Sequence, residues 1–350
     1  EATILYGVDS FTLPLFGGSD GLDITEKNPF GGHVISPGGT SGAETTNYAY
    51  NTVKQAMDIV SDVEEVEYNV ITAPNITEPT LTQHMVDIAE DRGDALALID
   101  IQDDFTPAQE SKSSFKNRVG DVDSAIKKMK DRNMDSSFGA AYYPYVQIVD
   151  RFTNSKLFVP PTVAALGVLS NSERIANVWF APAGFNRGGL SQGAAGIPVV
   201  NVAQKLTRKN RDGLYEIGVN PIASFPSEGL VVFGQKTLQA NPSALDRINV
   251  RRLLILIKKQ ISRIANRILF DQNARVTWNR FTSAVEPFLR GVQAGFGLED
   301  FRVVLDETTT TPDLIDRNIL YAKIFLKPTK SIEFIAIDFN ITNQGAAFDD

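Results

Sequence analysis

The sequence contains no cysteine and only two histidines, His33 and His84, among its 350 residues. Without cysteine the chain has no disulfides, no thiolate metal ligands and no cysteine nucleophile. The two histidines are too far apart in sequence for the spacing of a metal-binding motif. With only two imidazole groups, the chain also has few candidates for acid–base catalysis by histidine. The apolar run LLILI at 253–257 is far shorter than the roughly 18–20 residues of a membrane span, so we expect no membrane insertion.

Recognised catalytic and phosphate-binding motifs are also missing. GQKT at 234–237 lacks the spacing of a P-loop, and the serine of GGTSG has neither a base nor a nucleophile elbow. Asp100, Asp103 and Asp104 follow an apolar strand in LALIDIQDD, where carboxylates could hold Mg²⁺. A magnesium-dependent phosphoester hydrolase is therefore a remote alternative. Acidic residues that open a loop are usually just solvated, and we predict a protein that is not an enzyme and needs no cofactor.

Composition and charge place the chain among ordinary soluble proteins, with 43% hydrophobic and 22% charged residues. Its formal net charge of −8 is unevenly distributed. The stretch from Asp246 to Arg280 holds nine Lys or Arg and two Asp, a local charge of +7, while the remainder carries −15. The first residues, EATILYGVDS, contain neither Met nor a signal pattern, and we interpret the chain as lacking its natural N-terminus.

The order of elements predicts more than one domain. Residues 1–43 are rich in Gly, Ser and Pro, and we interpret them as a remnant of an upstream domain or a connector. Helix and strand patterns alternate over 44–232, which predicts an α/β domain with a mixed or largely parallel sheet flanked by helices. Residues 233–350 form helices followed by strands, as in an α+β domain that ends in a strand.

The segment DRINVRRLLILIKKQISRIANRILFD, residues 246–271, predicts an amphipathic helix. Its apolar stripe predicts the core-facing side and consists of Val250, Leu253, Leu254, Ile257, Ile261, Ile264 and Ile268. The opposite arc, called the basic face below, consists of Arg251, Arg252, Lys258, Lys259, Arg263 and Arg267. A solvated surface would explain this pattern as well. DNA binding is disfavoured, because the rest of the chain repels phosphate and the basic face contains neither aromatic residues for stacking nor a recognised groove-reading motif. Since Ile255 and Leu256 lie among the cations, we predict contact with an acidic protein surface.

Ordered blocks of sequence resemble a known family. They are AAYYPYVQIVD (140–150), VPPTVAALGVLS (159–170), VWFAPAGFNRG (178–188), LVVFGQKT (230–237), DRINVRRL (246–253), IDRN (315–318) and the final NITNQGAAFDD. Together they resemble the contractile tail sheath proteins of myovirus-type bacteriophages over about 40–350. Members of that family continue upstream with outer domains and an N-terminal strand that this chain lacks, and it stops just short of where the family usually ends.

The resemblance implies a structural virion protein that stacks as helical rings, expected to be hexameric, around a tail tube. Contraction would drive the tube through the host envelope, and the implied partners are other copies, the tube, the baseplate and the tail terminator. Neither nucleic acid nor a membrane is among them. Assembly in the host cytoplasm and location in the phage tail follow from the same resemblance. A phage-derived bacteriocin or another contractile injection machine remains open.

The family also suggests that terminal strands join a neighbour's sheet by β-addition. In SIEFIAIDFNIT, residues 331–342, the alternation places an apolar set on one side of the last strand; an ordinary internal strand fits equally well. We include Glu333, at the start of this strand, among the predicted contact residues. The apolar set is Ile335, Ile337, Phe339 and Ile341.

Overall fold

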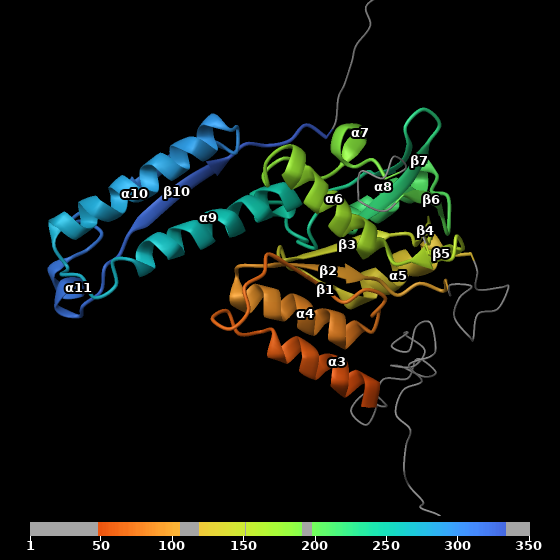
Figure 1. Ribbon diagram of the computed structural model, residues 1–350, viewed down its shortest axis with the longest axis horizontal. Coiled ribbons are helices and arrows are strands. Elements are labelled where there is room, and N and C mark those ends of the chain that lie inside the picture. Colours follow the sequence, from red (N-terminus) through yellow and green to blue (C-terminus); the bar gives the residue numbers. More distant parts are fainter. Residues whose placement is uncertain (1–47, 106–118, 151, 191–197, 334–350) are drawn as a thin grey trace, which may run out of the picture.

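The computed structural model describes residues 48–105, 119–150, 152–190 and 198–333. They form a body, from α3 (Tyr48–Ile59) to the short 3-10 helix η3 (Ala244–Asp246), and an elongated arm that contains α10, β9, α11 and β10 (Figure 1). Helix α9, Ile248–Asn266, joins the two. The predicted fold class, an α/β unit followed by an α+β unit, is confirmed. The boundary at 232 stays a prediction.

The centre of the body is a five-stranded sheet with the order β1-β2-β3-β7-β8. The first three pairs are parallel and β7–β8 is antiparallel. This is the mixed, largely parallel sheet that the alternating helix and strand patterns predict. Its strands are β1 (Val70–Thr72), β2 (Leu96–Asp100), β3 (Gly139–Tyr143), β7 (Val219–Phe225) and β8 (Gly229–Val232).

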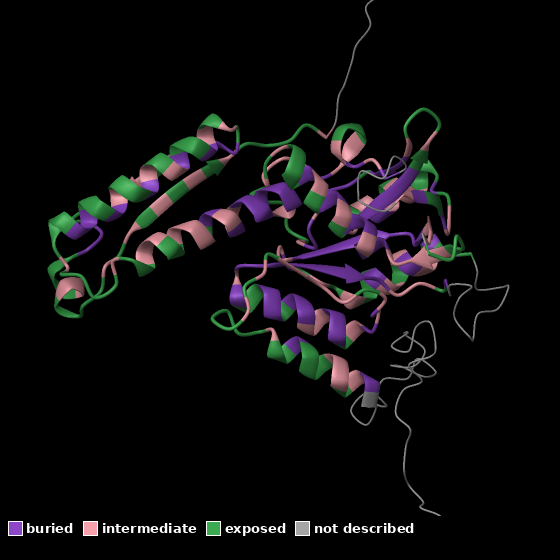
Figure 2. Ribbon diagram, viewed as in Figure 1, coloured by how far each residue is buried: buried purple, intermediate pink, exposed green. Residues whose placement is uncertain are grey.

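Both faces of this sheet are buried (Figure 2). In β2, Leu96 and Leu98 pack into one core with α6, while Ala97 and Ile99 pack into another with α4 and α5. A parallel strand covered on both faces is apolar at every position, which explains the unbroken run in LALI. The body helices are α3 (Tyr48–Ile59), α4 (Pro79–Arg92), α5 (Val122–Arg132), α6 (Pro161–Ile175), α7 (Gly184–Arg187) and α8 (Arg208–Glu216).

Helix α4 shows how local sequence sets an element's ends. Pro79 occupies its first turn, and Gly93 ends it in the left-handed conformation that glycine tolerates. The segment TEPTLTQHMVDIAEDRG, residues 77–93, predicts a helix with a threonine cap, an early proline and a late glycine, and the proline and glycine signals are confirmed. The predicted threonine cap was wrong, because the Glu78 carboxylate accepts from the backbone N–H of Leu81 at 2.7 Å. A carboxylate satisfies an orphan donor and also complements the helix dipole.

The stretch SFGAAYYPYVQIVD, which predicts one strand, contains two. β3 belongs to the large sheet, whereas β4, Val146–Val149, is the central strand of a three-stranded antiparallel sheet with the order β5-β4-β6. Pro144 lies between them and has no N–H to continue a ladder, so the chain changes sheets there. The outer strands are β5 (Lys156–Val159) and β6 (Val199–Val202).

The arm is built from α10 against a two-stranded antiparallel sheet of β9 and β10. The sequence predicts that Pro287 interrupts α10, but the helix continues through it. Val285 and Leu289, on either side of the proline, are buried in the arm core, and their packing stabilises the continuous helix. The bounds are α10 (Arg275–Ala294), β9 (Leu298–Val304), α11 (Pro312–Asp316) and β10 (Lys323–Pro328).

None of the helices in the described ranges is both long enough and apolar enough to cross a membrane. The predicted terminal strand, with Ile335, Ile337, Phe339 and Ile341, lies outside the described residues, as does the segment 1–43 with His33.

Candidate subunit interface

Helix α9 contributes to the cores of both the body and the arm. Leu253 and Ile257 are buried in the arm core, with Ile261 and other stripe residues packed against it. The predicted apolar stripe is therefore a core-facing side. Ile248 and Ile255 point into the body core instead. Ile255, which the sequence predicts on the contact face, is only 5% exposed, because the start of α9 is covered from two sides.

The first two cations of the basic face point into the body. Arg251 stacks on Phe138, 3.9 Å from the ring centroid, and donates to the Ser137 hydroxyl. Arg252 donates to the Glu173 carboxylate at 2.9 Å. Both arginines are buried, and burial lowers the pKa of Arg251 to about 10. These side chains hold α9 on the body. The sequence predicts them on an exposed contact face, and that placement is wrong because both are buried.

The middle of the basic face also bonds to the body. Lys259 donates to the Tyr68 carbonyl at 2.6 Å, and its ammonium lies 3.4 Å from an Asp94 carboxylate oxygen. Lys258, although exposed, donates to the Arg92 carbonyl at 3.1 Å. The stretch of α9 from Arg251 to Lys259 is thus held to the body by cations.

Toward the end of α9 the basic face is open to solvent. Arg263 pairs with Glu67, but both side chains are more than half exposed. Arg267 is exposed and forms no ion pair with any residue in the described part of the chain. Leu256 is partly exposed. Contact between this face and a partner stays a prediction, and its exposed cations are Lys258, Arg263 and Arg267.

The part of α9 around Lys259 and Arg263 lies against a loop, residues 60–69, which a buried arginine holds in place. The Arg92 guanidinium donates to carbonyls of this loop, including those of Val60 at 3.1 Å, Asp62 at 2.7 Å and Val66 at 2.8 Å. It also stacks on the Tyr68 ring at 4.0 Å. The role of this arginine could not be recognised from the sequence, since a single basic residue at a helix end is also the ordinary pattern of a C-terminal turn.

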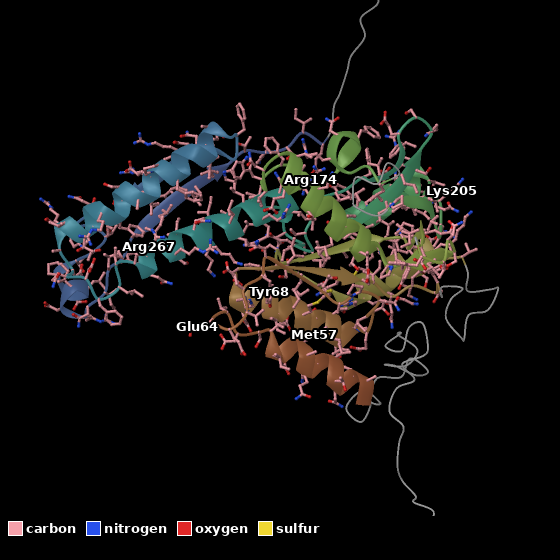
Figure 3. All side chains as sticks on the ribbon, viewed as in Figure 1. Met57, Glu64, Tyr68, Arg174, Lys205 and Arg267 are labelled. Atoms are coloured by element: carbon pink, nitrogen blue, oxygen red, sulfur yellow. The ribbon has the colours of Figure 1, made fainter. Side chains whose placement is uncertain are left out.

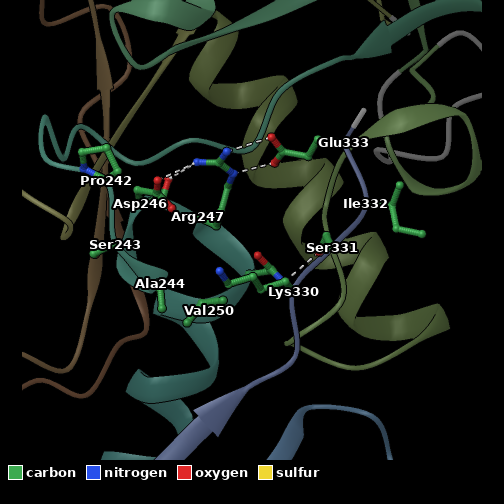
Figure 4. Close-up of a pocket in the computed structure, with 11 residues that line it drawn as sticks. Pro242, Ser243, Ala244, Asp246, Arg247, Val250, Lys330, Ser331, Ile332 and Glu333 are labelled. Carbon is green, nitrogen blue, oxygen red and sulfur yellow. Dashed lines mark hydrogen bonds and ion pairs between the residues drawn. The ribbon is translucent and has the colours of Figure 1, made fainter. Parts of the chain in front are cut away.

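Glu333, a predicted contact residue, is held inside the chain by a carboxylate clamp (Figure 4). Arg247 donates to its two oxygens at 2.6 and 2.9 Å, Tyr215 at 2.9 Å and Gln235 at 3.3 Å. Burial opposes the charge of Arg247, but the bonds to Glu333 outweigh it and raise the pKa of that guanidinium. The clamp fixes the point from which the C-terminal segment leaves the body.

The strap 330–333 connects the arm back to this clamp beside a groove of about 630 Å³ (Figure 4). Ser331 accepts from the Asn249 amide at 3.1 Å, so both α9 and the residue preceding it hold the strap. These residues could not be recognised from the sequence, because three separate segments bring Arg247, Tyr215 and Gln235 to Glu333 and Asn249 to Ser331.

The arm sheet has two strand edges that no strand of the described residues covers. Side chains of β10 alternate between exposed and partly buried, and Phe325 is 56% exposed. Figure 3 shows the same elongated arm with side chains projecting along its outer surface. An uncovered strand edge presents unpaired N–H and C=O groups to any strand that approaches it.

The acidic residues of the hydrolase alternative are structural. Asp100 is buried and accepts from the backbone N–H of Asn75 and the hydroxyl of Thr162, both at 2.8 Å. Burial raises the pKa of Asp100 to about 6. This carboxylate joins the end of β2 to the start of α6.

Its two neighbours bond elsewhere. Asp103 accepts from the N–H of Asp121 at 3.2 Å, and Asp104 pairs with Lys128 at 2.8 Å. Within the described ranges no group of three or more His, Cys, Asp or Glu residues could hold a metal ion. The predicted magnesium site is therefore not assembled there.

Solved structures with this fold come from contractile machines. The structure of the anti-feeding prophage baseplate has a TM-score of 0.63 and 21% identity, covering 82% of this chain and 72% of that one. The sheath complex of an extracellular contractile injection system, PVC, in its contracted state gives 0.61 and 20%, covering 81% and 74%. The fold is thus that of the subunits of contractile sheaths.

Comparison of the sequence with models of protein families points to the same class of protein. Those for the phage tail sheath central domain and C-terminal domain match residues 49–238 and 240–342. The tail sheath protein of Vibrio phage KVP40 is 32% identical over 304 residues, covering 83% of this chain and 44% of that protein. That of Enterobacteria phage T4 is 29% identical over 350 residues, covering 95% and 51%. The chain belongs to the phage tail sheath family and spans about half the length of these curated relatives.

Proposed function

We propose that this chain is the inner part of a contractile sheath subunit, which polymerises as helical rings around a phage tail tube. Contraction of the rings then drives the tube through the host envelope. The observation that carries the proposal is the ordered match of the central and C-terminal sheath domains over 49–342. The fold of the contracted PVC sheath supports it.

An open helical lattice needs contacts in which one patch of a subunit meets a different patch on the next. The uncovered edges of the arm sheet supply one patch, and the segment that leaves the body at Glu333 supplies the other. Its alternating Ile335, Ile337, Phe339 and Ile341 suit addition to a sheet edge. Each main-chain bond adds only about 0.5–1.5 kcal/mol, so several together tether neighbours while other contacts slide.

The subunit moves as a rigid body during contraction, with the terminal strands as hinges. Two facts support this: the body sheet is buried on both faces, and α9 packs into both cores. Structures of the extended and contracted sheath test it. Large internal refolding of residues 44–232 between the two states would contradict it.

The exposed end of the basic face, at Arg263 and Arg267, meets the acidic surface of the tube or of a neighbouring subunit. The other partners are the baseplate and the tail terminator. The subunits assemble in the host cytoplasm and remain in the virion as part of the tail. A sheath of a related injection machine is the second candidate, and the folds of the prophage and PVC structures favour it.

Electron microscopy of the full-length protein tests the proposal. Purified protein incubated with isolated tail tubes forms hollow, striated sheaths around them. Tubes that stay bare in the presence of folded, monomeric protein would contradict a sheath function.

A further inference from the structure

Three phenylalanines form an aromatic cluster on the surface of the body. Phe185 of α7, Phe225 at the end of β7 and Phe233 just after β8 have ring centroids 5.0–5.7 Å apart. Phe185 is 49% exposed and Phe233 41%. Three neighbouring aromatic rings, two of them exposed, form an apolar patch on this surface.

The carboxylate clamp lies beside this cluster. Gln235, which donates to Glu333, is two residues beyond Phe233, so the two positions are within about 7 Å along the backbone. The Arg211 guanidinium lies 5.2 Å from the Phe225 ring centroid and gives the cluster a positive rim. The chain therefore leaves the described structure next to an apolar surface with a cation at its edge.

The sequence that follows Glu333 has complementary chemistry. Phe334 and Ile335 come first, and the alternation continues to Ile341, with Asp338 as the acidic residue. At about 3.3 Å per extended residue, even the first few residues after Glu333 can reach the cluster. A segment with one apolar side needs an apolar surface whenever it is not paired in a sheet.

We propose that residues 334–341 cover the aromatic cluster of their own chain in the unassembled subunit and transfer to a neighbour on assembly. The clamp holds the segment at an effective concentration of the order of millimolar, so cis docking needs little intrinsic affinity. A free subunit then keeps its sheet-adding segment occupied. This rests on the proposed sheath function for the transfer, but the cis contact is measurable in the monomer without any assembly.

Disulfide trapping tests the cis contact, and the absence of native cysteine makes each designed pair unambiguous. The full chain carries Asn186→Cys, an exposed position beside Phe185, together with Ala336→Cys, which spares the apolar side of the segment. Mild oxidation at low protein concentration yields a cross-linked monomer, seen by mobility on a non-reducing gel. The matched control pair, Ser61→Cys with Ala336→Cys, places the first cysteine on the loop after α3 and cross-links at least about tenfold more slowly.

Adding Phe185→Ser and Phe233→Ser to the test pair slows monomer cross-linking by about tenfold. Both substitutions are at exposed rings, and circular dichroism checks that the fold is kept. Equal rates for the two cysteine pairs, no effect of the serine substitutions, or cross-linked dimers alone would each overturn the proposal. In the last case the cluster takes the segment of a second copy. Failure of the protein without cysteine substitutions to decorate tail tubes would count against the sheath function and not against the cis contact.

Discussion

Arg247 and Glu333 are 86 residues apart in the chain, yet the guanidinium of one donates to both carboxylate oxygens of the other, at 2.6 and 2.9 Å. Arg247 immediately precedes α9, and Glu333 is the last residue that the structure describes. This ion pair sets where the C-terminal segment leaves the body relative to the helix that carries the arm.

Because Glu333 accepts hydrogen bonds from Arg247, Tyr215 and Gln235, we expect Glu333→Gln to lower the stability of the folded chain. The amide keeps the shape but loses the charge that Arg247 requires, and we expect the free energy of unfolding to fall by about 1–2 kcal/mol in urea titration. Glu299→Gln is the matched control, because Glu299 pairs with Lys327 at the surface. A control that loses as much stability as Glu333→Gln would contradict the clamp's role.

Arg92→Lys tests the support of the loop 60–69. Lysine keeps the charge but lacks the planar guanidinium that donates to several carbonyls at once. We therefore expect the free energy of unfolding to fall by about 2–4 kcal/mol. Hydrogen exchange of the loop should increase as well. Arg280→Lys, at an exposed pair with Asp271, serves as the control and should be nearly neutral. Unchanged exchange in 60–69 would refute this role of Arg92.

Charge reversal should separate folding from assembly along α9. Arg252→Glu places a second carboxylate beside Glu173 in a buried position and should lower the free energy of unfolding by roughly 3–5 kcal/mol. Arg267→Glu, at an exposed position, should change it by less than about 0.5 kcal/mol but reduce the length of sheath formed on tail tubes. Sheaths of normal length from Arg267→Glu would remove this residue from the contact.

The buried carboxyl group of Asp100 should make the free energy of unfolding depend on pH. Burial raises its pKa from 3.8 to about 6 in the folded state, so the folded chain binds the proton more tightly than the unfolded chain does. The group's contribution is present at low pH and is lost as the pH rises through about 6, a change of about 3 kcal/mol. Asp100→Asn should flatten this decline in urea titrations between pH 4 and 7, whereas Asn at the exposed Asp131 should not. The prediction would be wrong if the free energy of unfolding fell with pH equally steeply in the wild type and in Asp100→Asn.

Much of the body could be predicted from local pattern. Unbroken apolar runs give buried parallel strands, and the proline and glycine around α4 mark its ends. The apolar stripe of α9 likewise identifies a core. The partners of the basic face could not be predicted, because Glu67, Asp94 and Glu173 are brought to α9 only by the tertiary fold. A periodic row of cations has the same appearance in sequence whether it faces water, a partner or the chain's own body.

Because α9 buries Ile255 in the body and Ile257 in the arm, neither core is complete without the same helix. The two halves should consequently melt together, as one calorimetric transition with matching van 't Hoff and calorimetric enthalpies. If the arm unfolds only together with the body, it can transmit a pulling force to the body without unfolding first.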